Sequence, residues 1–220
     1  MIDGDTQGSL SILFHARPAD PTFFCVSDLF SETPVDKPIR QIDSQISILA
    51  ADAALSNFLS VTGNIEHARQ ALARLAPDFD LCLMDTPPER NAISMCELAL
   101  ADFVISPAEL GLLELAGVAE LFATVQTVRS TINKKLQHLG IVCVKTNTRS
   151  AVEKATIAEM RVAYGAFLLD RQLPRRESVK AAINGRKPVW DNPRGDSHVK
   201  AAAEMRDFCD SLLNKIFTAA

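Results

Sequence analysis

The sequence of 220 residues lacks the features that mark fibrous, disordered and membrane-spanning chains. It contains only 9 glycines and its hydrophobic content is 47%, which excludes collagen-like and low-complexity chains. No apolar run approaches the roughly 18–20 residues that cross a bilayer, and the first residues lack the basic and apolar regions of a signal peptide. We therefore expect a folded chain, neither secreted nor inserted in a membrane, that forms one domain over residues 1–220.

The usual patterns of metal-binding and catalytic residues are also missing. The five cysteines are odd in number and widely spread, no pair has C-x-x-C spacing, and the four histidines are scattered. This favours a reduced, cytoplasmic protein in which each cysteine is a small buried hydrophobic residue and no structural metal is bound. One tryptophan and one tyrosine offer no stacking platform for single-stranded nucleic acid. No G-x-S-x-G, H-E-x-x-H or G-x-G-x-x-G motif marks another enzyme class.

The charges are unevenly distributed along the chain. Residues 1–133 contain 7 Lys and Arg against 18 Asp and Glu, a net charge of −11. Residues 134–220 contain 16 against 9, a net charge of +7. A basic half is typical of a surface that binds a polyanion, but charges spread over solvated helix faces produce the same count.

Short apolar runs alternate with longer segments of helical periodicity. This pattern predicts βα units and an α/β fold with a mainly parallel sheet flanked by helices. The predicted strands lie at 46–50, 81–84, 103–105, 141–144 and 166–169. The predicted helices lie near 52–60, 64–76, 91–100, 111–136, 150–163, 176–184 and 197–217. The run 140–146 has the G-x-x-x-x-K-T spacing of a phosphate loop without its second glycine, but its apolar residues predict a strand.

Asp85 follows a predicted buried strand and is itself followed by Thr-Pro-Pro. The carboxyl end of such a strand is the place where open α/β sheets bind ligands. An aspartate there can hold Mg²⁺, usually through water.

A second acidic cluster lies at the start of the sequence. Asp3 and Asp5 are two residues apart and precede Gln7 and Gly8. Such a cluster can orient a water and a metal-bound phosphate. Taken alone, the same run is also typical of a turn with a helix cap.

These two motifs resemble those of the ParA/Soj partition ATPases, deviant-Walker relatives of MinD. The run 3–9 is similar to the D-x-D-x-Q-G-[SN] motif of that family, and the run 80–88 is similar to its Y-D-x-x-x-x-D-x-P-P motif. Later segments also resemble motifs of this family and follow in the same order, so the resemblance covers nearly the whole chain. These segments lie at 101–109, 140–144, 173–175, 179–182 and 185–189. The resemblance implies the P-loop NTPase-like fold of the ParA/MinD superfamily.

The resemblance also implies roles for the matching residues, with ATP and Mg²⁺ as cofactors. Asp5 would orient or activate the hydrolytic water, and Asp3 would support the phosphate and Mg²⁺. Asp85 would be the Mg²⁺ partner of the Walker B motif. The remaining nucleotide-binding candidates are Gln7, Thr146, Asn147 and Pro174.

Family members bind duplex DNA nonspecifically through basic residues of their C-terminal part. The candidates here are Arg175, Arg176, Lys180, Arg186, Lys187, Arg194 and Lys200. The implied partners are double-stranded DNA, a ParB-like centromere-binding protein and a second copy in a homodimer. The implied activity is ATP hydrolysis that controls dimerisation and DNA release in plasmid or chromosome segregation, at the nucleoid of a bacterial cytoplasm and without a membrane.

The sequence departs from the family because it has no K-G-G-x-G-K-[ST] loop, whose amides and lysines hold the phosphates. We expect the first βα unit to be absent and the sheet to lack its central strand, which leaves an open hydrophobic slot unless another element or subunit fills it. Three explanations stay open. The chain is a truncated form of an active ATPase, or a shortened, catalytically silent relative that binds or regulates, or it shares only the fold and binds another ligand.

Overall fold

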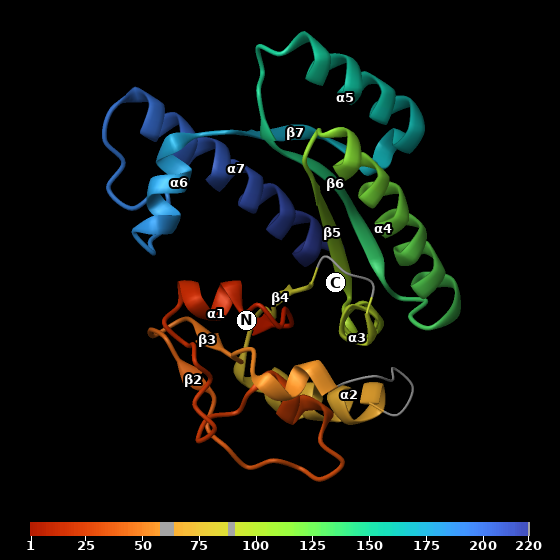
Figure 1. Cartoon of the computed structure of the whole chain (residues 1–220), viewed down its shortest axis with the longest axis vertical. Coiled ribbons are helices and arrows are strands. Elements are labelled where there is room, and N and C mark those ends of the chain that lie inside the picture. Colours follow the sequence, from red (N-terminus) through yellow and green to blue (C-terminus); the bar gives the residue numbers. More distant parts are fainter. Residues whose placement is uncertain (58–63, 88–90, 220) are drawn as a thin grey trace. The chain divides into compact units, whose positions relative to one another are not determined.

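The structure is a computed structural model that describes residues 1–220 except 58–63, 88–90 and 220, and the side chains of 57, 64, 112–116 and 219 are also left undescribed (Figure 1). The chain forms two compact units, Met1–Ala101 and Asp102–Ala220, called unit 1 and unit 2 below. The assignment of 1–220 to one domain stays a prediction. Within the described ranges, no helix is both long and apolar enough to cross a membrane.

Unit 1 is built from short strands and helices (Figure 1). Its strands are β1 (Ile2–Asp3), β2 (Arg40–Gln41), β3 (Ser47–Ile48) and β4 (Met84–Asp85). Its helices are α1 (Ser9–Leu13), α2 (Asn64–Leu75) and α3 (Ala92–Leu100), with the 3-10 helices η1 (Val26–Phe30), η2 (Ala53–Asn57) and η3 (Ala76–Asp78). β1 and β4 are parallel, β2 and β3 are antiparallel, and Ile2 also bridges to Leu49 in parallel.

The two faces of β1 pack in different clusters, because successive side chains of a strand point to opposite faces. Ile2 lies in the main core of the unit, and Met1, which precedes β1, packs against a second cluster that also contacts Leu10 and Phe14. The main core also contains Phe24, Val26, Leu29, Phe30, Leu49, Ala51, Leu55, Ala68, Ala71, Ile93 and Cys96. Together, these clusters fix β1 between α1 and the core.

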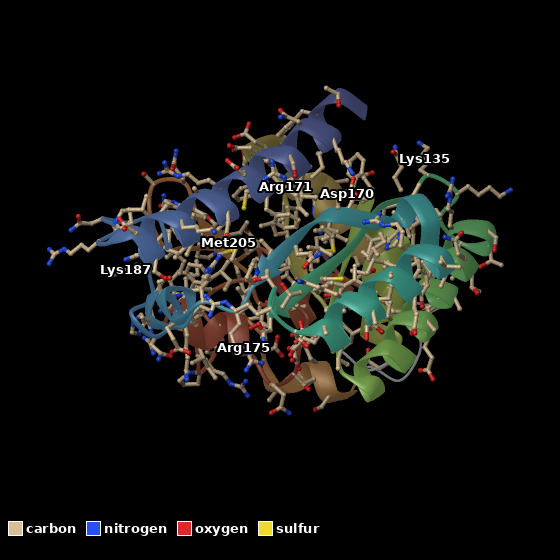
Figure 2. All side chains as sticks on the ribbon, turned by 90° about the horizontal axis from the view of Figure 1, so that it is seen from above. Lys135, Asp170, Arg171, Arg175, Lys187 and Met205 are labelled. Carbon is tan, nitrogen blue, oxygen red and sulfur yellow. The ribbon has the colours of Figure 1, made fainter. Side chains whose placement is uncertain are left out.

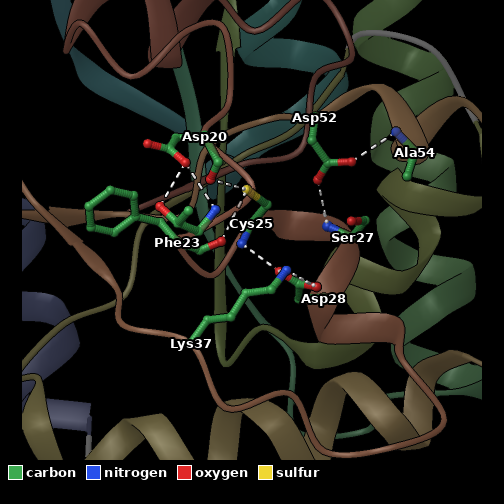
Figure 3. Close-up of polar contacts among 9 residues, drawn as sticks. Asp20, Phe23, Cys25, Ser27, Asp28, Lys37, Asp52 and Ala54 are labelled. Carbon is green, nitrogen blue, oxygen red and sulfur yellow. Dashed lines mark hydrogen bonds and ion pairs between the residues drawn. The ribbon is translucent and has the colours of Figure 1, made fainter.

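Polar contacts hold the long connection between α1 and β2 (Figure 3). The Cys25 N–H donates to Asp28 Oδ2 (2.9 Å), and Asp28 pairs with the Lys37 ammonium at 3.0 Å. The Ser27 N–H donates to Asp52 Oδ2 at 3.0 Å. Burial raises the pKa of the Cys25 thiol to about 11, so this cysteine stays protonated and behaves as a small buried hydrophobic residue.

Unit 2 contains a parallel sheet with strand order β5-β6-β7. Its strands are β5 (Phe103–Ala108), β6 (Gln137–Thr146) and β7 (Leu168–Pro174). Its helices are α4 (Leu112–Thr131), α5 (Ala151–Tyr164), α6 (Glu177–Asn184) and α7 (Asp196–Ala219), with the 3-10 helix η4 (Gly165–Phe167). Figure 1 shows α4 and α5 on one face of this sheet and α7 on the other. The core between the sheet and the helices α4 and α5 contains Ala108, Val118, Ile141, Cys143, Met160 and Leu168.

The structure confirms the predicted α/β fold with parallel strands flanked by helices. The run 140–146 lies in β6 and is therefore a strand, as predicted, and not a phosphate loop. The helix predicted at 111–136 ends at Thr131, where Ile132 and Asn133 both donate to the Val128 carbonyl (2.9 and 2.8 Å) and close the last turn. Residues 165–167 form a 3-10 turn, so β7 begins two residues after the predicted start. Part of the helix predicted at 52–60 lies outside the described residues.

The largest difference concerns the run 81–84, which its apolar residues predict to be a buried strand. Only Met84 and Asp85 form a strand, and Leu81 and Leu83 are 38% and 56% exposed. β4 pairs with β1 on one edge, while no described strand pairs with its other edge, so the run contributes only a short strand.

Candidate functional site

Asp3 is held at the end of β1 by the helix that follows it. Its side chain is fully buried, at 0% exposure, and its Oδ2 accepts hydrogen bonds from the Ser11 N–H (2.6 Å) and the Ser11 hydroxyl (2.5 Å). The Ser11 Oγ in turn accepts from the Ala51 N–H at 3.0 Å. The other oxygen, Asp3 Oδ1, has no hydrogen-bond partner. The site thus fixes this carboxylate through one oxygen and leaves the second unpaired, which is unusual for a buried polar atom.

Asp85 and Asp5 lie near this carboxylate. The parallel pairing of β1 and β4 puts Asp85 opposite Asp3, as expected for two strands whose carboxyl ends meet at one edge. Asp5 lies in the turn after β1, where its Oδ1 accepts from the Gln7 N–H at 2.9 Å. Partial removal from water, together with the charges of Asp3 and Asp5, raises the pKa of the Asp85 carboxyl. The structure thus brings the three predicted aspartates together, whereas their catalytic and metal-binding roles stay predictions.

A fourth acid, Glu97 of α3, belongs to this cluster, and the sequence motifs did not predict it. Its side chain is 5% exposed and neither carboxyl oxygen has a hydrogen-bond partner. Burial first, and then the charges of Asp85, Asp3 and Asp5, raise the pKa of Glu97 to about 8. The available signal was a lone acid in an otherwise apolar helical run, AISMCELAL.

Gly4 leaves room for the Glu97 side chain. A Cβ atom at this residue would lie 1.9 Å from Glu97 Oε1, which is far inside van der Waals contact. The Gly4 N–H donates to the Asp85 carbonyl at 2.9 Å, so the backbone here cannot move aside without breaking the strand pairing. The glycine between the two aspartates therefore admits the Glu97 carboxyl to the end of β1.

The oxygen donors of this cluster fit Mg²⁺ better than a softer metal. Mg²⁺ prefers carboxylate and water oxygens, and it is usually held by one or two carboxylates together with substrate phosphates. Across the described residues, no group of three or more His, Cys, Asp or Glu is arranged to hold a metal by itself. The exposed Asp85, with the buried charge of Asp3 beside it, fits an ion that keeps several waters, and these residues do not form a cage made only of protein ligands.

The predicted nucleotide-pocket residues of unit 2 also lie together. Thr146 ends β6 opposite Pro174 of β7, and the Thr146 carbonyl accepts from the Arg175 N–H at 3.0 Å. The Thr146 hydroxyl is buried without a hydrogen-bond partner. Asn147 follows in the turn, where its N–H donates to Glu153 Oε2 at 2.7 Å. These three candidates belong to unit 2, whereas Gln7 is an exposed residue of unit 1, and their contacts with a nucleotide stay predictions.

The basic candidates all lie in unit 2, on or near α6 and α7, and Figure 2 labels Arg175 and Lys187 among them. Arg176 differs from the rest because it is half-buried and forms a two-pronged ion pair with Glu204 of α7 (3.0 and 2.6 Å). Its guanidinium is therefore engaged within the unit. The exposed candidates are Arg175, Lys180, Arg186, Lys187, Arg194 and Lys200.

Solved structures share this fold. The chain is similar to an ATP complex of a McdA variant from Cyanothece, with a TM-score of 0.82, 19% identity, and coverage of 96% of this chain and 83% of that one. It is also similar to cobyrinic acid a,c-diamide synthase from Mycobacterium smegmatis with bound ADP and magnesium, with a TM-score of 0.74, 24% identity, and coverage of 100% and 82%. These likenesses show that the chain has a P-loop NTPase-like α/β fold.

Sequence comparison places the chain within that class. A family model described as "AAA domain" matches residues 1–138. Protein IncC of Escherichia coli is 28% identical over 221 residues, which cover 98% of this chain and 60% of IncC. The chromosome partitioning protein ParA of Caulobacter vibrioides is 25% identical over 197 residues, 86% of this chain and 73% of ParA. The chain belongs to the AAA domain family, in its group of ParA/Soj-type partition ATPases, and it spans 60% of the length of the IncC relative.

Proposed function

We propose that this chain is the nucleotide-binding domain of a partition or positioning ATPase that uses Mg²⁺ and ATP. The observation that carries the proposal is the acidic end of β1 and β4, where Asp3 keeps one buried oxygen unpaired beside Asp85. Two solved structures with a similar fold support it, because one is an ATP complex and the other has bound ADP and magnesium.

In this proposal each aspartate has a separate task. Asp85 binds the waters around the ion, and the buried Asp3 carboxylate, which Ser11 orients through two hydrogen bonds, adds negative charge beside it. Asp5, in the turn after β1, accepts a hydrogen bond from the attacking water and aligns it with the phosphate. Mg²⁺, when bound, would neutralise the charge that develops on the phosphate oxygens.

We expect the 220-residue chain to bind Mg·ATP weakly and to hydrolyse it poorly by itself. Its sequence has no glycine-rich, lysine-containing loop to cradle the phosphates, and such loops supply most of the phosphate contacts in this class. The alternative function is that of a catalytically silent relative that binds or regulates a partner, in which case the aspartates have no nucleotide to act on.

Calorimetric titration of the chain with Mg·ATP tests this proposal. We expect measurable binding that Asp85→Asn removes, while Asp36→Asn, a change of an exposed aspartate outside the cluster, leaves it intact. Absence of binding in the unmodified chain would favour the silent relative. Binding that is equally strong in both variants would show that the nucleotide sits elsewhere.

The proposal includes nonspecific binding to duplex DNA, a homodimer and a ParB-like partner, at the nucleoid of a bacterial cytoplasm. The support for DNA binding is the set of exposed basic residues on unit 2, whereas unit 1 is acidic. Because each phosphate contact releases counterions, a Lys180→Ala change should weaken duplex binding and lower the salt slope by about 0.9. Lys135→Ala, which removes a basic residue outside the candidate set, serves as the control in a mobility-shift assay at low salt. A chain with no affinity for duplex DNA, with or without ATP, would remove this part of the proposal.

A further inference from the structure

One histidine of unit 2 closes the loop that leads from α6 into α7 (Figure 1). The Arg194 N–H donates to His198 Nδ1 (3.1 Å), and His198 Nε2 lies 2.8 Å from the Val189 carbonyl. A backbone N–H can only donate and a carbonyl can only accept, so both contacts require the neutral ring with its hydrogen on Nε2. A single side chain in the first turn of α7 therefore joins the two arms of the loop.

The first arm of this loop is anchored by apolar packing. Val189 is 5% exposed and lies in a cluster with Ala201 of α7, and Trp190 packs against the same cluster. The second arm, with Arg194, is exposed and is joined to the anchored arm through the His198 ring. The position of the Arg194 backbone therefore depends on a contact that one side chain supplies.

The loop carries basic side chains that can reach a polyanion. Lys187 and Arg194 are exposed, and Figure 2 labels Lys187. Lys187 lies 3.9 Å from Asp191, but both side chains are more than half exposed, so solvent screens this pair and a phosphate can replace the carboxylate. Among the described residues, no carboxylate pairs with Arg194. A loop that is already ordered loses less conformational entropy when both cations contact phosphates.

We propose that His198 is a positioning residue for duplex DNA, because its ring holds the loop in the conformation in which Lys187 and Arg194 contact phosphates together. This inference rests on the proposed DNA binding of unit 2, and it adds a residue that does not itself touch DNA. Without the ring, the arm with Arg194 moves independently of the anchored arm. Ordering that arm on the duplex then opposes binding, since fixing backbone dihedrals costs conformational entropy.

Titration of a fluorescent DNA duplex with the full chain, at several salt concentrations, measures both the affinity and the salt slope. Arg194→Ala should lower the salt slope by about 0.9, the value for one lost phosphate contact. His198→Ala should weaken binding about fivefold or more, because two hydrogen bonds are lost, and should lower the slope by a similar amount although it keeps every lysine and arginine. Val199→Ala, at the next residue of α7, is the control and should change neither value. A purely structural role would lower stability and leave the slope of the folded chain unchanged.

Two conservative variants and a double-mutant cycle test whether the contact with Arg194 carries the effect. His198→Asn keeps an acceptor near the place of Nδ1 and should restore most of the affinity, whereas His198→Gln keeps only a donor toward Val189 and should bind as weakly as His198→Ala. Arg194→Ala should weaken binding less in the His198→Ala chain than in the unmodified chain. Equal binding by the Asn and Gln variants, or equal effects of Arg194→Ala in both chains, would overturn the proposal.

Hydrogen exchange without DNA measures the order of the loop itself. We expect the Arg194 amide to exchange faster in His198→Ala than in the unmodified chain and in Val199→Ala. Unchanged exchange would contradict the role of the ring.

The duplex titration separates this inference from the proposed function. An unmodified chain that does not bind duplex DNA would overturn the proposed DNA binding, and this inference with it. An unmodified chain that binds, together with a His198→Ala chain of the same affinity and salt slope, would overturn only the role of His198.

Discussion

Units 1 and 2 differ in the length of their strands and in the polar residues that they bury. Unit 2 has a sheet of three parallel strands, the longest of which is the ten-residue β6, and its buried polar residues, among those described, are the neutral Ser106, Thr124 and Thr146. The strands of unit 1 are each two residues long in the described chain, and its buried polar residues include the acids Asp3 and Glu97. Unit 1 carries 6 Lys and Arg against 14 Asp and Glu, and unit 2 carries 17 against 13.

The buried residues of unit 2 mainly stabilise the fold, whereas those of unit 1 include residues of the candidate site. Long paired strands with an apolar core stabilise unit 2, because each of them buries apolar side chains against neighbouring strands and helices. Unit 1 keeps carboxylates buried without full pairing, which costs free energy that the unit tolerates at a functional site. We therefore expect substitutions in unit 2 to act mainly on stability, and those at the acidic cluster to act on both binding and pH dependence.

The largest effect should come from the core of unit 2. Ile141 of β6 is fully buried in the cluster formed with α4 and α5. Ile141→Ala should lower the free energy of unfolding by about 2–5 kcal/mol, since it removes apolar contacts and leaves a cavity. Urea denaturation measures the change. Val162→Ala, at a position that is 89% exposed, is the control and should shift it by less than about 0.5 kcal/mol.

In unit 1, we expect the loss of one polar contact to lower the free energy of unfolding nearly as much as the loss of an apolar side chain in unit 2. Ser11→Ala removes the hydroxyl that donates to Asp3 Oδ2 and accepts from the Ala51 N–H. We expect a loss of about 1.5–3 kcal/mol, because a hydrogen bond to a buried carboxylate is lost and an amide is left unpaired. Thermal unfolding followed by circular dichroism measures it, and Ser56→Ala at an exposed hydroxyl is the control. A Ser11→Ala chain as stable as the unmodified one would contradict the role of Ser11.

The acidic cluster should also make stability depend on pH. The pKa of Glu97 is raised to about 8 in the folded chain, above its ordinary value of 4.5. The folded state therefore keeps a proton that the unfolded state loses, so stability is fully present below about pH 4.5 and falls as the pH rises toward 8. The contribution of this residue has a limiting slope of about −1.4 kcal/mol per pH unit.

Glu97→Gln isolates that contribution. Urea denaturation between pH 5 and pH 8 should show a flatter pH profile for this variant than for the unmodified chain. The matched change Glu66→Gln, at an exposed helical residue, should leave the profile nearly as it is. If the Glu97→Gln and unmodified profiles coincide, the carboxyl is not protonated in the folded chain.

The smallest effect should come from the ion pair between α6 and α7. Arg176 and Glu204 are half-buried and paired through two contacts. A double-mutant cycle with Arg176→Met and Glu204→Gln should give a coupling free energy of about 1 kcal/mol or less, because solvent still screens this pair. A duplex-binding defect in Arg176→Met as large as that of Lys180→Ala would show that this arginine also contacts DNA.

Much of this architecture could be predicted from the residue pattern. Asp85 follows a predicted strand, and the resemblance of the runs 3–9 and 80–88 to two motifs of one family implied that Asp3 belongs to the same site, where the pairing of β1 with β4 places it. The helices 64–75, 92–100, 151–164 and 177–184 lie within one or two residues of the predicted bounds. Their apolar periodicity and caps, such as the Asn91 side chain that accepts from the Ser94 N–H at 3.0 Å, are local signals.

The rest depended on contacts between distant residues. Glu97 joins the cluster only because α3 packs across the end of β1 and Gly4 leaves room for its carboxyl, which no local pattern encodes. The apolar run 81–84 predicts a strand that prefers burial, but it does not say whether a neighbouring strand exists. The early end of α4 at Thr131 is instead a local feature, because Ile132 and Asn133 both donate to the Val128 carbonyl.

The Mg²⁺ dependence of ATP affinity tests most directly whether the acidic end of β1 and β4 binds Mg²⁺ with a nucleotide. Fluorescence titration of the chain with a labelled ATP analogue, with and without Mg²⁺, measures it. We predict that Mg²⁺ increases the affinity of the unmodified chain and of Asp36→Asn but not that of Asp85→Asn. An affinity that is the same with and without Mg²⁺ in the unmodified chain would contradict the claim.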